Sequence, residues 1–283
     1  MNSQDFQLFS NIVKSRSGLV LTEEKVYLLE SRLVPLARRR GLENLEALAD
    51  EVRRSNDEHL LEEITEAMTT NETFFFRDTK PFDTFRDAVL PQLLKQRAAK
   101  KSLRIWTAAC STGQEPYSIA MLLKEEAAKM AGWRVEIMAT DISREVLEKA
   151  KAGLYSQFEV QRGLPIQLLM KHFHQVGEMW QIDSSIRAMV KFQPKNLLED
   201  LGSVGQFDVI FCRNVLIYFD QITKSKVLKE IHKALADDGA LFLGGAETVL
   251  GICDSFKPID GQRGVYTSAD GGLTAAPQAN SAA

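Results

Sequence analysis

The stretch RIWTAACSTGQEPYSIA, residues 104–120, decides the fold that we expect for this 283-residue chain. Its first half is apolar and predicts a buried strand. The small residues that lead to Gly113 predict a tight loop, and the remainder predicts the first turns of a helix. In an open parallel sheet, ligands bind beyond the carboxyl ends of the strands. The loop between this strand and this helix is therefore the expected ligand site.

The loop has one glycine, Gly113, whereas dinucleotide sites of the GxGxxG type use three to approach a pyrophosphate closely. Glu115 follows at the start of the helix, where its charge would repel a phosphate. The pattern therefore disfavours a dinucleotide and suits a cationic ligand with amine or hydroxyl donors, such as S-adenosylmethionine. Alternatively, Glu115 is only a first-turn charge that stabilises the helix.

Asp141 ends the second predicted strand, residues 135–141, and lies 28 residues after Gly113. A carboxylate at this place can accept hydrogen bonds from ribose hydroxyls. The alternative is that Asp141 only caps the next helix together with Ser143. The loop and the acidic residue together favour a nucleoside-containing ligand more strongly than either does alone.

Helical patterns occupy the first 70 residues. The spacing of apolar residues predicts helices over residues 5–18, 22–40, 43–54 and 57–68. Pro35 lies inside the second of these patterns and should kink or split that helix. We therefore predict a small all-α domain with its linker over residues 1–70.

Strands and helices alternate from residue 71 onward. After a helix over residues 81–100, five strands separated by helices are followed by two short strands. This order predicts an α/β, Rossmann-like fold over residues 71–268, with a mostly parallel, doubly wound sheet and a final antiparallel strand. We expect a small β-subdomain near residues 176–192. The small and polar residues 269–283 predict a disordered tail.

The composition excludes several classes of protein. A net charge of −3 and a pI near 5.9 give no overall attraction to nucleic acid or to acidic membranes. The cysteines Cys110, Cys212 and Cys253 are far apart and form no CxxC pair, which argues against a disulfide framework and a zinc site. We expect no signal peptide, because the first ten residues lack a basic segment followed by an apolar run, and we expect no membrane span, because no apolar run is long enough. We expect a cytoplasmic protein without a metal.

Four motifs carry a resemblance to a known family. TTNETFFFRD, STGQEPYSIA, NLLED and CRNVLIYFD occur in this order and begin at residues 69, 111, 196 and 212. They resemble the chemotaxis receptor methyltransferase family, often called CheR, and the likeness covers residues 5–267. It implies a helical domain ahead of a domain that uses S-adenosylmethionine and releases S-adenosylhomocysteine. It also implies methylation of glutamate side chains on bacterial chemoreceptors, the methyl-accepting chemotaxis proteins, in sensory adaptation.

The resemblance also implies a set of site residues. Nine positions match the cofactor contacts of the family: Asn71, Thr73, Arg77, Glu115, Asp141, Asn196, Leu197, Arg213 and Asn214. Because a glutamate carboxylate with a pKa of about 4.3 is already ionised at neutral pH, the reaction needs no general base. We expect Arg77 to orient the acceptor carboxylate and Tyr218 to donate a hydrogen bond at the reacting centre. The alternatives are a helix-ending turn for Asn71 and Thr73, and simple packing for Tyr218.

The second predicted helix is basic. The resemblance implies that its arginines form a receptor-docking patch: Arg32, Arg38, Arg39 and Arg40. The alternative is a solvated helix end beside its own dipole. Pro35 interrupts the basic pattern that is usual in the family. The expected partner is the helical bundle of a chemoreceptor, which would recruit the protein from the cytoplasm to membrane-bound receptor arrays.

Some members of the family also bind a peptide tethered to the receptor. Residues 174–192 match the segment that does so, but they are short and contain one glycine, Gly177. We therefore expect a monomeric, tether-independent enzyme. Three rival functions are a methyltransferase for RNA or small molecules, a non-catalytic adaptor that binds S-adenosylmethionine, and an NAD-dependent oxidoreductase. The acidic pI argues against RNA as the substrate. The intact Arg77, Asn214 and Tyr218 argue against a non-catalytic adaptor, and the single-glycine loop argues against an oxidoreductase.

Overall fold

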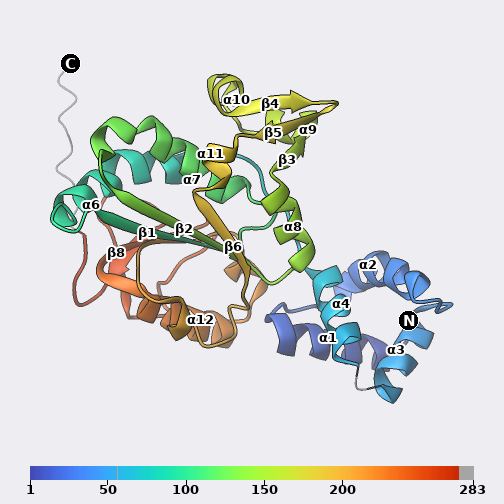
Figure 1. The fold of residues 1–283 in the computed structure, drawn as a ribbon. Coiled ribbons are helices and arrows are strands. Elements are labelled where there is room, and N and C mark those ends of the chain that lie inside the picture. Colours follow the sequence, from blue (N-terminus) through green and yellow to red (C-terminus); the bar gives the residue numbers. More distant parts are fainter. Residues whose placement is uncertain (56, 274–283) are drawn as a thin grey trace.

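The computed structural model describes residues 1–55 and 57–273, and it has two parts (Figure 1). The N-terminal part consists of helices and a short 3-10 turn that precedes α2. The helices are α1 (Ser3–Ser17), α2 (Val26–Arg39), α3 (Leu45–Arg54) and α4 (Glu58–Met68). Their apolar faces meet in one core that includes Phe9, Leu29, Leu48 and Ile64. The predicted all-α domain is confirmed, with its helices close to the predicted bounds.

Local signals explain where these helices begin and end. The side chains of Asn2, Asn44 and Asp57 accept backbone N–H bonds at the starts of α1, α3 and α4. Gly18 ends α1 in the left-handed conformation, with φ at 79°. The expected split at Pro35 is wrong, because α2 continues through it. The buried stripe of α2, which includes Leu33, packs on both sides of the proline and offsets the missing backbone hydrogen bond.

The second part is built on a seven-stranded sheet with the order β6-β2-β1-β7-β8-β10-β9. Its strands are β1 (Ser102–Ala108), β2 (Arg134–Asp141), β6 (Val190–Pro194), β7 (Phe207–Cys212), β8 (Leu235–Leu243), β9 (Phe256–Pro258) and β10 (Val265–Ser268). Neighbouring strands from β6 to β8 are parallel, whereas β10 runs antiparallel to both β8 and β9. The predicted doubly wound sheet with a final antiparallel strand is confirmed.

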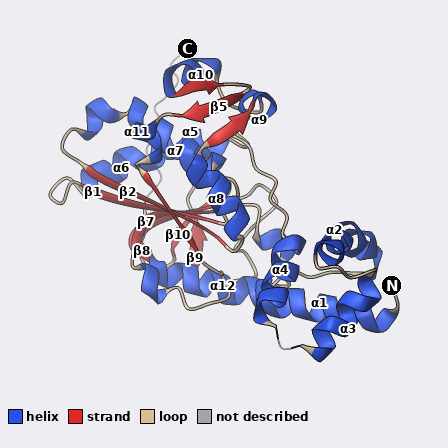
Figure 2. Cartoon of the chain, turned by 45° about the vertical axis from the view of Figure 1, so that its right-hand side comes forward, coloured by secondary structure: helices blue, strands red, loops and turns tan. Residues whose placement is uncertain are grey.

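Helices cover both faces of this sheet (Figure 2). One face packs against α5 (Lys80–Thr84), α6 (Leu90–Gln96) and α7 (Gln114–Glu125), and the other against α12 (Gln221–Ala234). Alternate strand residues enter the two cores, so that Phe211 faces the first and Ile210 the second. The helix predicted over residues 81–100 is not uniform, because a π-helical turn over Phe85–Val89 separates α5 from α6.

The β-subdomain is larger than predicted. Its three-stranded antiparallel sheet has the order β3-β5-β4, with β3 (Leu154–Ser156), β4 (Phe173–Val176) and β5 (Met179–Ile182). Four helices flank these strands. α8 (Arg144–Ala152) precedes β3, α9 (Gln157–Gln161) and α10 (Ile166–His172) lie between β3 and β4, and α11 (Ser184–Arg187) follows β5. The predicted range 176–192 was wrong at both ends. The short β3 pairs with a strand more than twenty residues later, and β6 belongs to the main sheet.

The folded chain extends beyond residue 268, where the predicted tail begins. The Ala269 amide donates a hydrogen bond to the Ser255 carbonyl oxygen, and Leu273 is buried. Residues 274–283, the rest of the predicted tail, lie outside the described residues.

Gly163 fixes the β-subdomain against the segment that carries the TFFFR motif. It follows α9 with φ at 84°, and an added Cβ would overlap the Phe75 carbonyl oxygen. Phe75 is fully buried and packs edge-to-face against Tyr155 of β3, with ring centroids 5.1 Å apart. This close approach holds the motif at the edge of the sheet.

We predict that Gly163→Ala lowers the free energy of unfolding by about 2 kcal/mol or more, because both the φ angle and the Phe75 backbone reject a side chain. Gly177→Ala is the matched control. Gly177 also has a positive φ of 60°, but nothing lies within 4 Å of its added Cβ. The Gly177→Ala variant should therefore lose only about 1 kcal/mol of its free energy of unfolding. Equal losses for the two variants in urea unfolding would contradict the close approach.

Candidate functional site

An open cleft lies at the carboxyl ends of β1, β2, β6 and β7, with an empty volume of about 950 Å³. The order of the strands changes direction between β1 and β7, which is where ligands bind in open α/β sheets. The cleft brings together Tyr218 and all nine predicted cofactor residues: Asn71, Thr73, Arg77, Glu115, Asp141, Asn196, Leu197, Arg213 and Asn214.

The loop after β1 has a strained backbone. Ala109 and Ser111 have φ values of 59° and 50°, a region that non-glycine residues rarely adopt. Asp141 stabilises the loop, because its Oδ2 accepts a hydrogen bond from the Ser111 amide at 2.8 Å and its Oδ1 one from the Ser143 amide at 3.1 Å. Burial raises the pKa of Asp141, and the backbone N–H bonds oppose that rise. Asp141 therefore joins the loops after β1 and β2. Neither of its predicted roles, which are to bind ribose hydroxyls and to cap the next helix, includes this contact.

Glu115 is part of a buried ion pair. Its Oε2 accepts a hydrogen bond from Nη1 of Arg213 at 2.7 Å. The other end of the Arg213 guanidinium donates to the Arg77 carbonyl oxygen at 2.9 Å and to Asp78 at 2.7 Å. Burial raises the pKa of Glu115, and the nearby Arg213 opposes that rise. The pair links α7 and the end of β7 to the TFFFR segment, so that Glu115 is more than a first-turn charge.

The N-terminal domain forms one wall of the cleft. Ser17, the last residue of α1, and Leu19, two residues later, line it, and Leu19 forms an antiparallel bridge with Phe219. The Asn196 side chain donates to the Arg16 carbonyl oxygen at 2.6 Å and accepts from the Leu198 amide at 3.0 Å. Asn196 therefore joins the two domains as well as lining the cleft. No sequence signal pointed to this wall, since residues 17–19 read only as a helix end.

The segment between the domains carries Arg77 into the cleft. The Asn71 carbonyl oxygen accepts a hydrogen bond from the Ser111 hydroxyl at 2.8 Å, and the Asn71 side chain donates to Thr69. Arg77 donates to the Glu72 carbonyl oxygen at 2.8 Å, and its guanidinium carbon lies 5.5 Å from the centre of the Phe74 ring. These contacts use part of the guanidinium and leave other N–H groups for a ligand.

Sequence reasoning missed Glu247. This buried carboxylate follows β8 and accepts hydrogen bonds from four backbone amides, those of Asn214, Val215, Ile217 and Gly244, at 2.7–3.2 Å. It thereby fixes the loop after β7, in which Asn214 has a φ of 59°. An acidic residue directly after a predicted strand in this kind of sheet was the available signal.

Comparison with known proteins decides the family. The model of the CheR methyltransferase SAM binding domain matches residues 71–265, and that of the CheR methyltransferase all-alpha domain matches residues 4–69. The chain belongs to the CheR methyltransferase family. It is therefore a methyltransferase that uses S-adenosylmethionine, and its two family domains coincide with the two parts of the fold.

Curated relatives match along nearly their whole length. Chemotaxis protein methyltransferase Cher2 of Pseudomonas putida is 38% identical over 269 residues, which cover 94% of this chain and 98% of the relative. Chemotaxis protein methyltransferase 1 of Pseudomonas aeruginosa is 40% identical over 265 residues, which cover 92% of this chain and 96% of the relative. A chemotaxis protein methyltransferase of Vibrio parahaemolyticus is 39% identical over 262 residues, or 92% of this chain and 94% of the relative.

The lining of the cleft fits the CheR cofactor. Glu115 and Asp141 face it as acceptors, and carboxylate oxygens that already accept one hydrogen bond retain further lone pairs. The Oδ1 atom of Asn214 is buried and has no hydrogen-bond partner among the described residues, so that it can accept a bond from a ligand.

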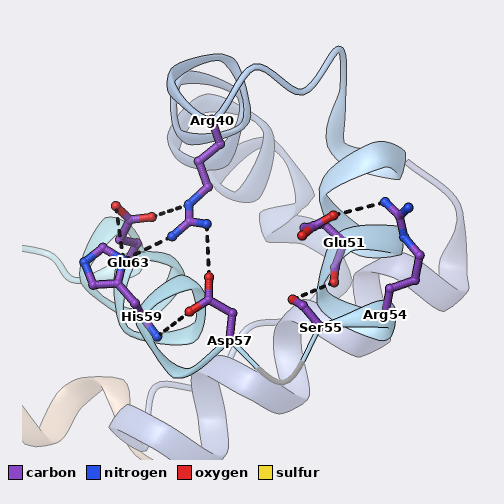
Figure 3. Close-up of polar contacts among 7 residues, drawn as sticks. All are labelled: Arg40, Glu51, Arg54, Ser55, Asp57, His59 and Glu63. Atoms are coloured by element: carbon purple, nitrogen blue, oxygen red, sulfur yellow. Dashed lines mark hydrogen bonds and ion pairs between the residues drawn. The ribbon is translucent and has the colours of Figure 1, made fainter.

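The four arginines of the predicted docking patch differ in their surroundings. Arg32 donates to the carbonyl oxygens of Met68 and Thr69, both at 2.7 Å, and so caps the end of α4. Arg40 donates to Glu63 at 2.6 Å and to Asp57 at 3.2 Å (Figure 3). Arg38 and Arg39 are exposed. Arg32 and Arg40 therefore hold α2 against α4, and the docking role of the four arginines stays a prediction.

Two kinds of feature are absent from the described ranges 1–55 and 57–273. No helix there is both long and apolar enough to cross a lipid bilayer. No three His, Cys, Asp or Glu side chains there are grouped so as to hold a metal ion.

We predict that Glu247→Gln weakens binding of S-adenosylhomocysteine by about tenfold or more. The side-chain amide would place an NH₂ donor against backbone N–H donors, and the loop that carries Asn214 would lose hydrogen bonds that fix it. Calorimetric titration measures the loss. The control is Glu230→Gln, which removes a carboxylate of α12 that is paired with the exposed Lys233, and this variant should bind normally. Unchanged affinity in the Glu247 variant would contradict its role in fixing the loop.

Proposed function

We propose that this CheR protein methylates glutamate side-chain carboxylates of bacterial chemoreceptors, forming methyl esters that serve sensory adaptation. The similarity to chemotaxis protein methyltransferases supports a chemotactic role. The observation that carries the proposal is the division of charge in the cleft. Buried carboxylates, Asp141 and Glu115, form its interior, whereas the half-buried Arg77 and Tyr218 offer hydrogen-bond donors. The first group suits a cationic donor and the second an anionic acceptor.

In this proposal, the chain's residues hold and orient rather than transfer protons. S-adenosylmethionine supplies the methyl group on a positively charged sulfur. Asp141 would hold the ribose hydroxyls, and Glu115 with Asn214 would hold the amino-acid end. Asn71, Thr73 and Leu197 would complete the enclosure, and Arg213 keeps Glu115 in place. Since the acceptor carboxylate is already an anion at neutral pH, alignment is the remaining requirement.

Arg77 and Tyr218 are proposed to align the acceptor. The planar guanidinium of Arg77 can donate two parallel hydrogen bonds to a carboxylate. The backbone of Tyr218 is fixed, because its carbonyl oxygen accepts from the Val20 amide at 3.0 Å. Its side chain lines the cleft. The N-terminal domain therefore contributes to the position of this tyrosine.

Receptor docking is proposed at the exposed end of α2. Arg38 and Arg39 present positive charge to a glutamate-rich helical bundle and would recruit the protein to receptor arrays. We also propose that the protein acts as a monomer without a peptide tether. The hairpin between β4 and β5 has a loop of only Gly177 and Glu178. Calorimetry with the receptor's C-terminal peptide tests this, and micromolar binding would contradict tether independence.

The decisive assay uses radiolabelled S-adenosylmethionine and receptor-containing membranes. Glutamate methyl esters release labelled methanol in mild alkali, whereas N-methyl products retain the label. The proposal requires base-labile counts in the receptor band. Label that resists alkali would contradict carboxylate methylation.

We predict that Arg77→Ala lowers kcat about 100-fold and Tyr218→Phe about tenfold, because each removes a donor at the reacting centre. Affinity for S-adenosylhomocysteine should change less than kcat in both. Arg162→Ala is the control, since Arg162 pairs with Glu72 and lies over the Phe74 ring without lining the cleft. Wild-type turnover by both variants at saturating cofactor would refute the assignment.

We predict that Arg39→Glu raises the KM for the receptor about tenfold and leaves cofactor affinity unchanged, and that salt weakens the wild-type reaction. The control is Arg134→Glu, at the exposed start of β2 and so at the sheet end opposite the cleft. A reaction insensitive to salt, or an equal effect of the two reversals, would count against docking through α2.

A further inference from the structure

Three aliphatic side chains are exposed at one edge of the cleft. The exposed fractions are 43% for Ile217, 83% for Ile222 and 62% for Leu250. Ile217 precedes Tyr218, Ile222 lies in the first turn of α12, and Leu250 lies in the loop after β8. We call these three residues the aliphatic rim.

Contacts between two loops bring the rim together. Glu247, which lies three residues before Leu250, accepts a hydrogen bond from the Ile217 amide at 3.2 Å. The Gln221 side chain donates to the Gly251 carbonyl oxygen at 3.2 Å, so that the neighbours of Ile222 and Leu250 touch. The same buried carboxylate therefore holds the rim and the Asn214 loop of the cleft. Through Ile217, the rim is part of the same loop as Asn214 and Tyr218, which line the cleft.

Positive charge extends from the rim along α12. Ile222, Lys226 and Lys229 are spaced at i, i+4 and i+7, which places them on one face of the helix, and all three are exposed. The opposite face, with Val227 and Ile231, is buried against the sheet. Lys233, one turn further, is paired with Glu230 at 2.6 Å. The exposed face of α12 thus combines an aliphatic end near the cleft with two lysines beyond it.

We propose that the aliphatic rim and the α12 lysines bind the acceptor helix itself, an amphipathic and acidic helix that lies across the mouth of the cleft. This inference rests on the proposed function. A glutamate side chain is short, so the helix that carries it must lie against the edge of the cleft. Residues three or four positions from the acceptor glutamate share its face and would contact the rim. Aliphatic or small apolar residues there would bury the rim, and acidic residues further along would face Lys226 and Lys229.

The surface suits a folded helix better than a flexible acidic segment. A helix presents apolar and acidic side chains at fixed spacing, matching the order of rim and lysines along α12. An extended chain would have to be ordered on binding, at an entropic cost. The rim therefore selects glutamates by their helical neighbours, whereas Arg77 and Tyr218 act on the carboxylate itself.

The test is steady-state methylation of a receptor cytoplasmic fragment by the full chain, scored as base-labile counts. The double variant Ile222→Ser, Leu250→Ser should raise the KM for the fragment about tenfold, with kcat and the affinity for S-adenosylhomocysteine within about twofold of wild type. Lys226→Glu with Lys229→Glu should also raise KM, and high salt should reduce the difference from wild type.

Two matched controls separate the rim from exposed surface in general. Ile166→Ser with Met170→Ser removes two exposed aliphatic residues of α10, and Lys95→Glu with Lys100→Glu reverses two exposed charges before β1, away from the cleft. Both should leave KM unchanged. An unchanged KM in the rim variant, or an equal rise in the controls, would overturn the proposal. If wild-type protein yields no base-labile counts, the proposed function and this inference both fail, which distinguishes that result from a failure of the rim alone.

Discussion

Hydrogen bonds from backbone amides to buried carboxylates hold the candidate site together. Asp141 accepts hydrogen bonds from amides in the loops after β1 and β2. Glu247 accepts four hydrogen bonds from amides in the loops after β7 and β8. The loops they hold contain non-glycine residues with positive φ, among them Ser111 and Asn214, which need support from their surroundings. A carboxylate that satisfies several amides provides it, because leaving those amides unpaired in a buried place is costly. The shape of the cleft thus depends on acidic residues, which also make it suitable for a cation.

The N-terminal domain is part of the same site rather than only an attached docking module. Three contacts cross between the domains at the edge of the cleft. They are the Leu19–Phe219 bridge, the hydrogen bond from Val20 to Tyr218 and the hydrogen bond from Asn196 to Arg16. A partner that binds the N-terminal domain therefore contacts an element that also fixes the position of Tyr218. A few short contacts thus join the residues after α1 to the loop that carries Tyr218.

The sequence predicted the fold well because its signals are local. Helix caps, apolar runs and the order of strands and helices specified both domains, and the motif residues do meet in one cleft. What it could not predict depends on contacts distant in the chain. Arg32 and Arg40 resembled surface charges, yet they bind α4. The three-residue β3 has its partner far along the chain, and Glu247 has its role only because the loops after β7 and β8 are neighbours. Pro35 does not split α2, because packing outweighs the local penalty.

We propose that the cleft between Asp141, Glu115 and Asn214 holds the methyl donor beside Arg77 and Tyr218. A crystal structure of the chain grown with saturating S-adenosylhomocysteine tests it most directly. We expect electron density for the nucleoside against Asp141, with the sulfur facing Tyr218. Density elsewhere on the chain, or an empty cleft in crystals of protein that binds the compound in solution, would contradict it.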